Sequence, residues 1–282
     1  MGERILNVNE KSLINLRKIK SIRLLKRRIE LNFSHQFGGA IWKSALSHST
    51  ATLLLEIRDG NEKKTTFSAV RLNDGSMLWR DVTFEESWWV GLEAAQGDVA
   101  LFSLFTDQSN PERKALIAYH ILHKKIMWWN NDFSLSAVGE NCVLGMTTQY
   151  GQKEVALNLL TGKESSFEPV TDELVIIRPS QYPEGHNYFE TVRSFLSSRF
   201  NFQAVASLEY LEESSFIFIS AYERNEDGMS NELFVLSADG EPELRENLGR
   251  QLKGIGQDTF FIYAGSVIFV RNRGELFSYK IV

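Results

Sequence analysis

Short runs of apolar residues, separated by polar turns, recur along most of the chain. In the first clear example, the runs 51–57 and 66–72 precede the turn Asn73-Asp74-Gly75 and a short run at 76–79. Runs of about seven residues bounded by turn residues are typical of strands. On the same grounds we expect strands at 99–105, 115–121, 126–129, 142–147, 154–159, 216–221, 232–237, 259–263, 267–271 and 276–282. The pattern predicts an all-β chain.

The spacing of the turns indicates a repeat. They fall near residues 74, 124, 162, 240 and 274, which leaves separations of 50, 38, 78 and 34 residues. Three of these bracket the roughly 40–50 residues of a four-stranded propeller blade. Runs such as 101–105 are apolar on both faces, and sheets packed between neighbouring sheets cover both faces. We predict a β-propeller with about five blades of four-stranded antiparallel sheet. A β-sandwich or a two-sheet barrel is the alternative.

One internal segment, residues 168–204, interrupts the repeat. Beyond its two prolines, residues 186–196 place apolar side chains on one helical stripe. These are Phe189, Val192, Phe195 and Leu196. Asn187, with Glu190 three residues later, matches the capping pattern. We therefore expect a helical insertion near 186–200 that lies on the propeller body.

Charge divides the chain into two parts. Residues 1–30 contain nine Lys/Arg and three Asp/Glu, a net charge of +6, whereas the other 252 residues contain 22 and 33, a net charge of −11. We expect a basic N-terminal arm at 1–28 and a single propeller domain at 29–282. The alternation that begins at Ile29 predicts a strand that pairs with the last blade and closes the ring. The acidic body argues against a nucleic-acid groove across the propeller.

The arm itself leaves two interpretations open. Leu13, Leu16, Ile19 and Ile22 recur every three residues among basic side chains, which favours a weakly amphipathic helix. The segment Lys11–Arg28 is either a solvated tail or an electrostatic anchor for anionic lipid or nucleic acid.

The single cysteine and the hydropathy of the chain indicate the cellular compartment. Cys142 has no second cysteine with which to form an intramolecular disulfide, and its apolar neighbours predict a buried thiol. We see no signal peptide and no run of about 18 apolar residues that would span a membrane. These features favour a cytoplasmic location.

The order of several short motifs resembles a bacterial family known only as a domain of unknown function. The motifs are Phe33-Ser34-His35-Gln36-Phe37, Ile41-Trp42-Lys43, Leu55-Glu56-Ile57-Arg58-Asp59, Phe67-Ser68-Ala69-Val70, Trp79, Trp88-Trp89-Val90-Gly91-Leu92 and Ala115-Leu116-Ile117-Ala118. The similarity spans residues 30–282, and its strand–turn–Trp repeats are similar to those of quinoprotein- and WD-like propellers. The resemblance implies a fold and brings no catalytic residue. One cysteine and this chain length disfavour quinone chemistry.

Five residues are candidates for a ligand-binding site. Trp88 and Trp89 are adjacent, so on a strand they would point to opposite faces, one into the core and one outward. Glu56 and Arg58 are two residues apart and share one face. With Glu93 they could form a charged cluster at a propeller mouth. The alternative interpretations are packing between blades for the tryptophans and exposed ion pairs for the charged residues.

Other chemistry receives little support from the sequence. It has no Gly-x-Gly-x-x-Gly, Walker or Gly-x-Ser-x-Gly motif. His120 and His123 bracket a strand end and a turn, a poor arrangement for shared metal ligation. We predict no metal and no cofactor, and the catalytic residues, if any, are unknown. The sequence favours a non-catalytic binding or scaffold protein for a protein or small-molecule partner. The alternatives are a carbohydrate-active propeller enzyme, and a membrane- or nucleic-acid-associated factor that acts through the arm.

Overall fold

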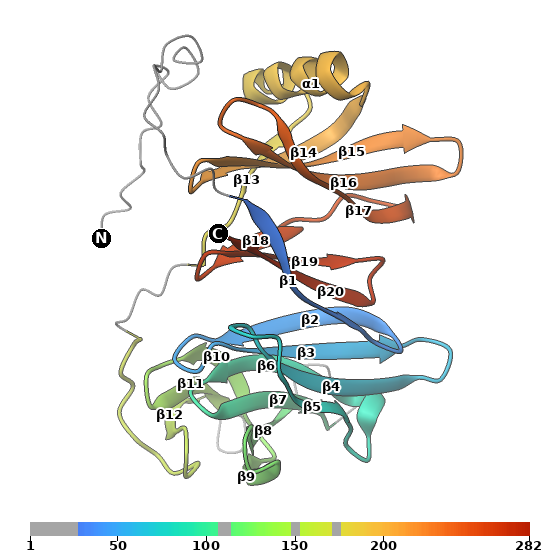
Figure 1. Cartoon of the computed structure of the whole chain (residues 1–282). Coiled ribbons are helices and arrows are strands. Elements are labelled where there is room, and N and C mark those ends of the chain that lie inside the picture. The colour runs from blue at the N-terminus through green and yellow to red at the C-terminus, as the bar shows by residue number, and fades with distance from the viewer. Residues whose placement is uncertain (1–27, 107–113, 148–152, 171–175) are drawn as a thin grey trace.

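The computed structural model describes residues 28–106, 114–147, 153–170 and 176–282, which form five antiparallel sheets (Figure 1). Blade 1 contains β2 (Ala40–Ser47), β3 (Thr52–Asp59), β4 (Lys64–Arg71) and β5 (Met77–Val82). Blade 2 contains β6 (Val90–Gln96), β7 (Val99–Phe105), β8 (Lys114–His120) and β9 (Lys125–Asn130), preceded by the 3-10 turn η2 (Ser87–Trp89). Blade 3 contains β10 (Ser134–Val138), β11 (Cys142–Thr147) and β12 (Lys153–Asn158).

The remaining two blades contain the C-terminal half of the chain and one N-terminal strand. Blade 4 contains β13 (Ser180–Pro183), β14 (Ala204–Glu213), β15 (Phe216–Asn225), β16 (Gly228–Ser237) and β17 (Pro242–Leu252), with helix α1 (Asn187–Phe200) between its first two strands. Blade 5 contains β18 (Phe260–Tyr263), β19 (Ser266–Arg271), β20 (Glu275–Ile281) and β1 (Ile29–Gln36). The all-β propeller class and about five blades are confirmed, as is the helix near 186–200.

Strand β1 joins the two ends of the repeat. It pairs antiparallel with β20, from Ile29 opposite Ile281 to Gln36 opposite Glu275. The prediction that this strand pairs with the last blade is confirmed. Because β1 leads directly into blade 1, it ties the first blade of the chain to the last one.

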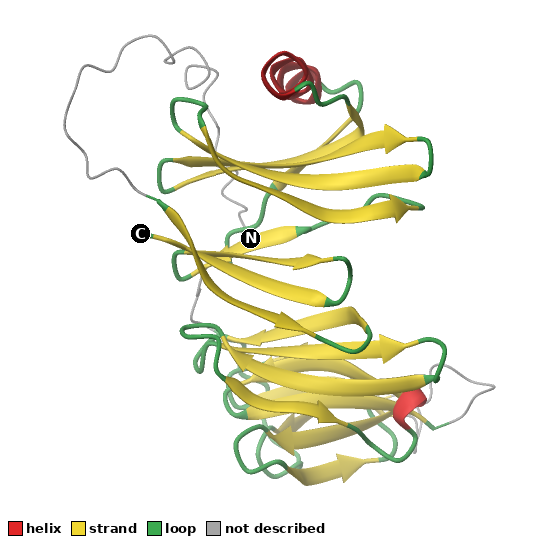
Figure 2. Cartoon of the chain, turned by 45° about the vertical axis from the view of Figure 1, so that its right-hand side comes forward, coloured by secondary structure: helices red, strands yellow, loops and turns green. Residues whose placement is uncertain are grey.

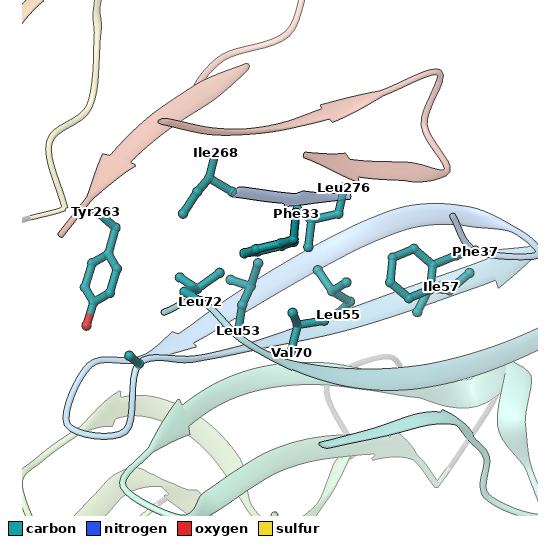
Figure 3. Packing of buried hydrophobic residues seen from close by; sticks show 11 residues of the cluster. Phe33, Phe37, Leu53, Leu55, Ile57, Val70, Leu72, Tyr263, Ile268 and Leu276 are labelled. Atoms are coloured by element: carbon teal, nitrogen blue, oxygen red, sulfur yellow. The ribbon is translucent and has the colours of Figure 1, made fainter. Parts of the chain in front are cut away.

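The blades stack face to face in the order 4, 5, 1, 2, 3 (Figure 2). A buried apolar cluster fills each junction, and Figure 3 shows the one between blades 5 and 1. This cluster contains Phe33, Phe37, Ala51, Leu53, Leu55, Ile57, Val70, Leu72, Tyr263, Ile268 and Leu276. The strands apolar on both faces therefore lie between two neighbouring sheets, as their sequence requires.

The ring closure that we expected differs from the structure. Among the described residues, no buried cluster joins blade 3 to blade 4, the two blades that each pack on only one neighbouring blade. Helix α1 covers the free face of blade 4 and buries Phe189 and Leu196 against it. Because the helix supplies the apolar cover that a fifth junction would give, blade 4 is buried without blade 3.

The cap of helix α1 lies one residue earlier than the residue that we predicted. The Nδ1 atom of His186 accepts the backbone N–H of Tyr188 at 3.2 Å, so His186 caps the helix and Asn187 is its first residue. The prediction of Asn187 as the cap is wrong, because the side chain that accepts the N–H in the first turn is that of His186.

A tight glycine turn in one blade lies under an aromatic ring of the preceding blade. Gly75 has φ +72°, and a Cβ atom there would lie 2.4 Å from the ring of Phe33 on β1. Gly162 has φ +66°, and its Cβ atom would lie 2.8 Å from the ring of Trp128 on β9. Both positions need glycine for the positive φ and for the close approach of the ring.

The basic arm cannot be compared with the structure. The predicted helix at 13–22, and all of the arm except Arg28, lie outside the described residues. In the part of the chain that the structure does describe, no helix has the length and the apolar character needed to cross a membrane.

Candidate functional site

Glu56 lies at the junction of blades 1 and 2. It is on β3 and only 1% exposed. One carboxylate oxygen accepts the backbone N–H of Leu92 on β6 at 2.7 Å, and the other accepts Nε–H of Arg58 at 2.6 Å. The predicted shared face of Glu56 and Arg58 is therefore observed, but Glu56 is not an exposed strand-end charge. Its burial follows from the packing of blade 2 over β3.

The guanidinium of Arg58 lies between two indole rings. Its Cζ atom is 5.6 Å from the ring centroid of Trp42 on β2 and 5.3 Å from that of Trp88 in η2. Both distances are within the range of a cation–π contact. We call Trp42, Arg58 and Trp88 the indole platform. Trp42 is 70% exposed, the highest value among the exposed large apolar side chains of the described residues.

The tryptophan pair is not on a strand. Trp88 and Trp89 belong to the 3-10 turn η2, so they do not alternate across a sheet as we predicted. Both are half-buried, and the backbone N–H of Trp89 donates to the Glu86 carbonyl at 2.9 Å. The turn presents the Trp88 ring to Arg58, whereas Trp89 is not part of the platform.

Glu93 is at the margin of the same junction and is held by two lysines. Its carboxylate lies 3.0 Å from Nζ of Lys43 on β2 and 3.7 Å from Nζ of Lys114 on β8. Burial alone would raise the pKa of Glu93. Hydrogen bonds from Ser103 and Lys43, and the charges of the two lysines, outweigh burial and leave the pKa below its ordinary value.

Gly91, at the start of β6, lies close to Glu56 and to Ser103. A Cβ atom on Gly91 would lie 3.6 Å from an oxygen of Glu56 and 3.7 Å from Oγ of Ser103, the residue that hydrogen-bonds Glu93. Four of the five candidates, Glu56, Arg58, Trp88 and Glu93, therefore meet around the start of β6. Trp42 and Lys43 also belong to this site, although the motif Ile41-Trp42-Lys43 did not predict this role.

Both carboxylates of the site are paired within the chain. Both oxygens of Glu56 accept hydrogen bonds from its own chain, and Glu93 is ion-paired. Trp42 is 70% exposed and the Arg58 side chain 23% exposed, so both can be reached by a ligand. In the described residues, no group of three or more His, Cys, Asp or Glu side chains is placed to hold a metal ion.

Five stacked antiparallel blades, with an N-terminal strand that completes the C-terminal blade, define a β-propeller. The predicted resemblance to a family known as a domain of unknown function is confirmed. The model of the family described as domain of unknown function (DUF4905) matches residues 46–128. This match begins near the end of β2 and ends within β9, so it covers most of blades 1 and 2, a shorter span than the 30–282 that we expected.

Three solved structures illustrate the likeness to other proteins. BamB from Moraxella catarrhalis is 9% identical, with a TM-score of 0.33 and coverage of 84% of each chain. A DUF4221 family member from Bacteroides vulgatus is 10% identical, with a TM-score of 0.31 and coverage of 91% of this chain and 98% of that one. The propeller domain of the Trilobed protease from Pyrococcus furiosus is 9% identical, with a TM-score of 0.31 and coverage of 84% and 65%. No curated protein matches the sequence.

Proposed function

We propose that this propeller is a non-catalytic binding protein that contacts a protein partner through the indole platform. The observation that carries the proposal is the exposure of Trp42, a large apolar ring held open to solvent beside a guanidinium. Tryptophan and arginine are enriched among the few residues that supply most of the binding energy of an interface.

The charge arrangement around the platform supports this function. Arg58 is already paired with Glu56, so a partner that covers the guanidinium does not have to neutralise an isolated charge. The Lys43–Glu93 ion pair lies nearby and remains partly exposed. An aromatic centre with a charged rim is the usual composition of a protein interface.

The same geometry gives less support to a carbohydrate-active enzyme. A glycosidase needs one carboxylic acid that is protonated at working pH and a second carboxylate facing the sugar. Glu56 is buried and hydrogen-bonded on both oxygens, and the pKa of Glu93 is lowered. Neither group is suited to donate a proton to a leaving group.

The predictions about the basic arm and about the cellular location stay predictions. Attachment to a membrane or nucleic acid depends on Lys11–Arg28, and residues 11–27 lie outside the described structure. A cytoplasmic location rests on the single cysteine, Cys142, which is buried between blade 3 and the segment after it.

The test is site-specific photo-crosslinking on the full chain. Benzoylphenylalanine replaces Trp42, and the protein is irradiated in an extract of the cells that produce it. We expect a discrete crosslinked species, identified by mass spectrometry, that excess unlabelled wild-type chain suppresses. Excess chain carrying Arg58→Ala should suppress it at least tenfold less well, because the platform loses its cation.

Leu160 provides the matched control, since it is apolar and 58% exposed but lies on blade 3. Benzoylphenylalanine at this position should not give the same species. Identical crosslinks from positions 42 and 160, or equal competition by wild type and Arg58→Ala, would rule out a specific platform.

A further inference from the structure

A cavity of about 580 Å³ opens where blades 1, 4 and 5 meet. The inner strand of blade 5, β18, has four residues, whereas the inner strand of blade 1, β2, has eight. The loop 254–259, which leads into β18, borders the cavity on the side of blade 4. The volume is within the range of about 300–1,000 Å³ that is usual for small-molecule sites.

One wall of the cavity is apolar and incompletely covered. Ile41, Ile176, Phe261 and Val270 line it, and each is only partly buried against the core between blades 5 and 1. Trp42 also lines the cavity. An apolar ligand body placed here would cover surface that the fold itself leaves open to water.

The opposite wall is polar and rigid. Tyr222 and Asn231 line it and are each 2% exposed. The Tyr222 hydroxyl accepts the N–H of Gly256 at 2.8 Å, and Glu209 accepts the N–H of Thr259 at 3.0 Å. These bonds fix both ends of the loop 256–259, so the wall is formed before any ligand arrives.

The charges on the lining are mostly positive. Lys43, Arg178 and Arg273 are cationic, and Asp258 is the single acidic residue among the lining residues, which all belong to the described structure. Lys43 is paired with Glu93, and Arg178 with Asp258. Arg273 is exposed and has no ion pair with any described residue.

We propose that this cavity binds a small organic anion, a monocarboxylate with an apolar body. The carboxylate pairs with Arg273, and the body lies along Ile41 and Phe261. A net positive lining on a chain with a formal charge of −5 selects for such an anion, because the rest of the surface repels it. The cavity shares Trp42 with the indole platform, but Arg273 and Phe261 are not part of the platform, so either proposal can fail alone.

The test is calorimetric titration of the full chain with octanoate and, separately, with octan-1-ol. Both probes share the apolar tail, so only the charge differs. We expect octanoate to bind at least tenfold more tightly than the alcohol. Arg273→Gln should weaken octanoate binding about tenfold and leave binding of the alcohol unchanged.

Two further variants separate a specific site from non-specific uptake. Ser44→Phe, at an exposed position on β2 that lines the cavity, should abolish binding of both probes while the far-UV circular dichroism stays unchanged. Arg224→Gln, an exposed arginine away from the cavity, should leave both affinities intact. Equal binding of the two probes, an equal effect of Arg224→Gln and Arg273→Gln, or undiminished binding by Ser44→Phe would overturn the proposal.

Discussion

Two buried glutamates each accept a backbone N–H from the start of the blade that follows in sequence. Glu56 on β3 binds the N–H of Leu92, and Glu209 on β14 binds the N–H and the hydroxyl of Thr259. They are 1% and 2% exposed. A buried carboxylate is tolerated only with such partners, so these residues fix how consecutive blades meet.

Removal of the first carboxylate should destabilise the fold. Glu56→Ala leaves the Leu92 N–H without a partner, which costs about 1–3 kcal/mol for the orphaned donor alone, and it also frees Arg58 from its ion pair. The free energy of unfolding from urea titration measures the loss. Glu62→Ala, at an exposed position in the β3–β4 turn, is the control and should change stability by less than about 0.5 kcal/mol. An equal loss of stability in the two variants would show that the hydrogen bonds of Glu56 do not stabilise the junction.

Because the pKa of Glu209 is raised, we expect the stability of the fold to depend on pH. Burial is the main cause that raises the pKa of Glu209 above its ordinary value of 4.5. Above pH 4.5 the unfolded chain has released this proton while the folded chain still holds it, so stability falls as the pH rises through the folded pKa. In the variant Glu209→Gln this side chain cannot ionise, so its stability should not fall over the same pH range.

The measurement is the free energy of unfolding of wild type and Glu209→Gln between pH 4 and pH 8. The variant should gain stability relative to wild type as the pH rises. The exposed Glu226→Gln should show a constant difference from wild type over the same range. A constant difference for Glu209→Gln as well would mean that its pKa is not raised.

At the scale of elements, the outer strand of one blade is tied to the next by a repeated hydrogen bond. Trp79 on β5 donates from Nε1 to the Ile121 carbonyl at 2.9 Å, and Trp128 on β9 donates to the Leu159 carbonyl at 2.9 Å. On β1, Asn32 donates to the Leu72 carbonyl at 3.4 Å. Each carbonyl belongs to the residue directly after the third strand of the next blade.

Loss of one such bond should weaken the junction of blades 1 and 2. Trp79→Phe keeps an aromatic ring but leaves the buried Ile121 carbonyl unpaired, at a cost of about 1–3 kcal/mol. Trp129→Phe is the matched control, because Trp129 is 49% exposed, and its effect should stay within about 0.5 kcal/mol. Thermal or urea unfolding followed by circular dichroism compares them, and equal effects would contradict the role of the bond.

The sequence predicted the outer hairpins of the blades better than their inner strands. The strands before Gly75, Gly162 and Gly240, and the strand after Gly75, were found because long apolar runs and glycine turns mark them. The inner strands β2 and β6, and the outer strand β17, were missed, because half-exposed residues break their apolar pattern. Their identity as strands depends on hydrogen bonds to a neighbour that is already placed.

At the scale of the whole molecule, β1 links the first and last blades of the sequence. Among the described residues, it is the one strand of blade 5 that the chain joins directly to blade 1. It covers the edge of β20 and places Phe33 in the core of the junction that Figure 3 shows. The edge of a sheet left without its partner is prone to pair with another chain.

A truncated chain that begins at Phe37 should therefore expose the edge of β20 and associate with other copies. We expect larger assemblies in size-exclusion chromatography and a lower, less cooperative thermal transition. A chain that begins at Arg28 keeps β1 and should elute and unfold like the full chain. Normal elution of the chain that begins at Phe37 would show that β1 is dispensable.

The sequence alone determined the class of the fold, because strands apolar on both faces must lie between sheets and glycine turns fix where the hairpins reverse. It also pointed to Glu56, Arg58, Trp88 and Glu93, since charged and aromatic residues stand out at the ends of apolar runs. Tertiary structure decided that Glu56 is buried, that Arg58 lies between Trp42 and Trp88, and that α1 covers blade 4 in place of blade 3. These outcomes depend on which blade packs on which, and residue spacing along one chain does not encode the distances between its blades.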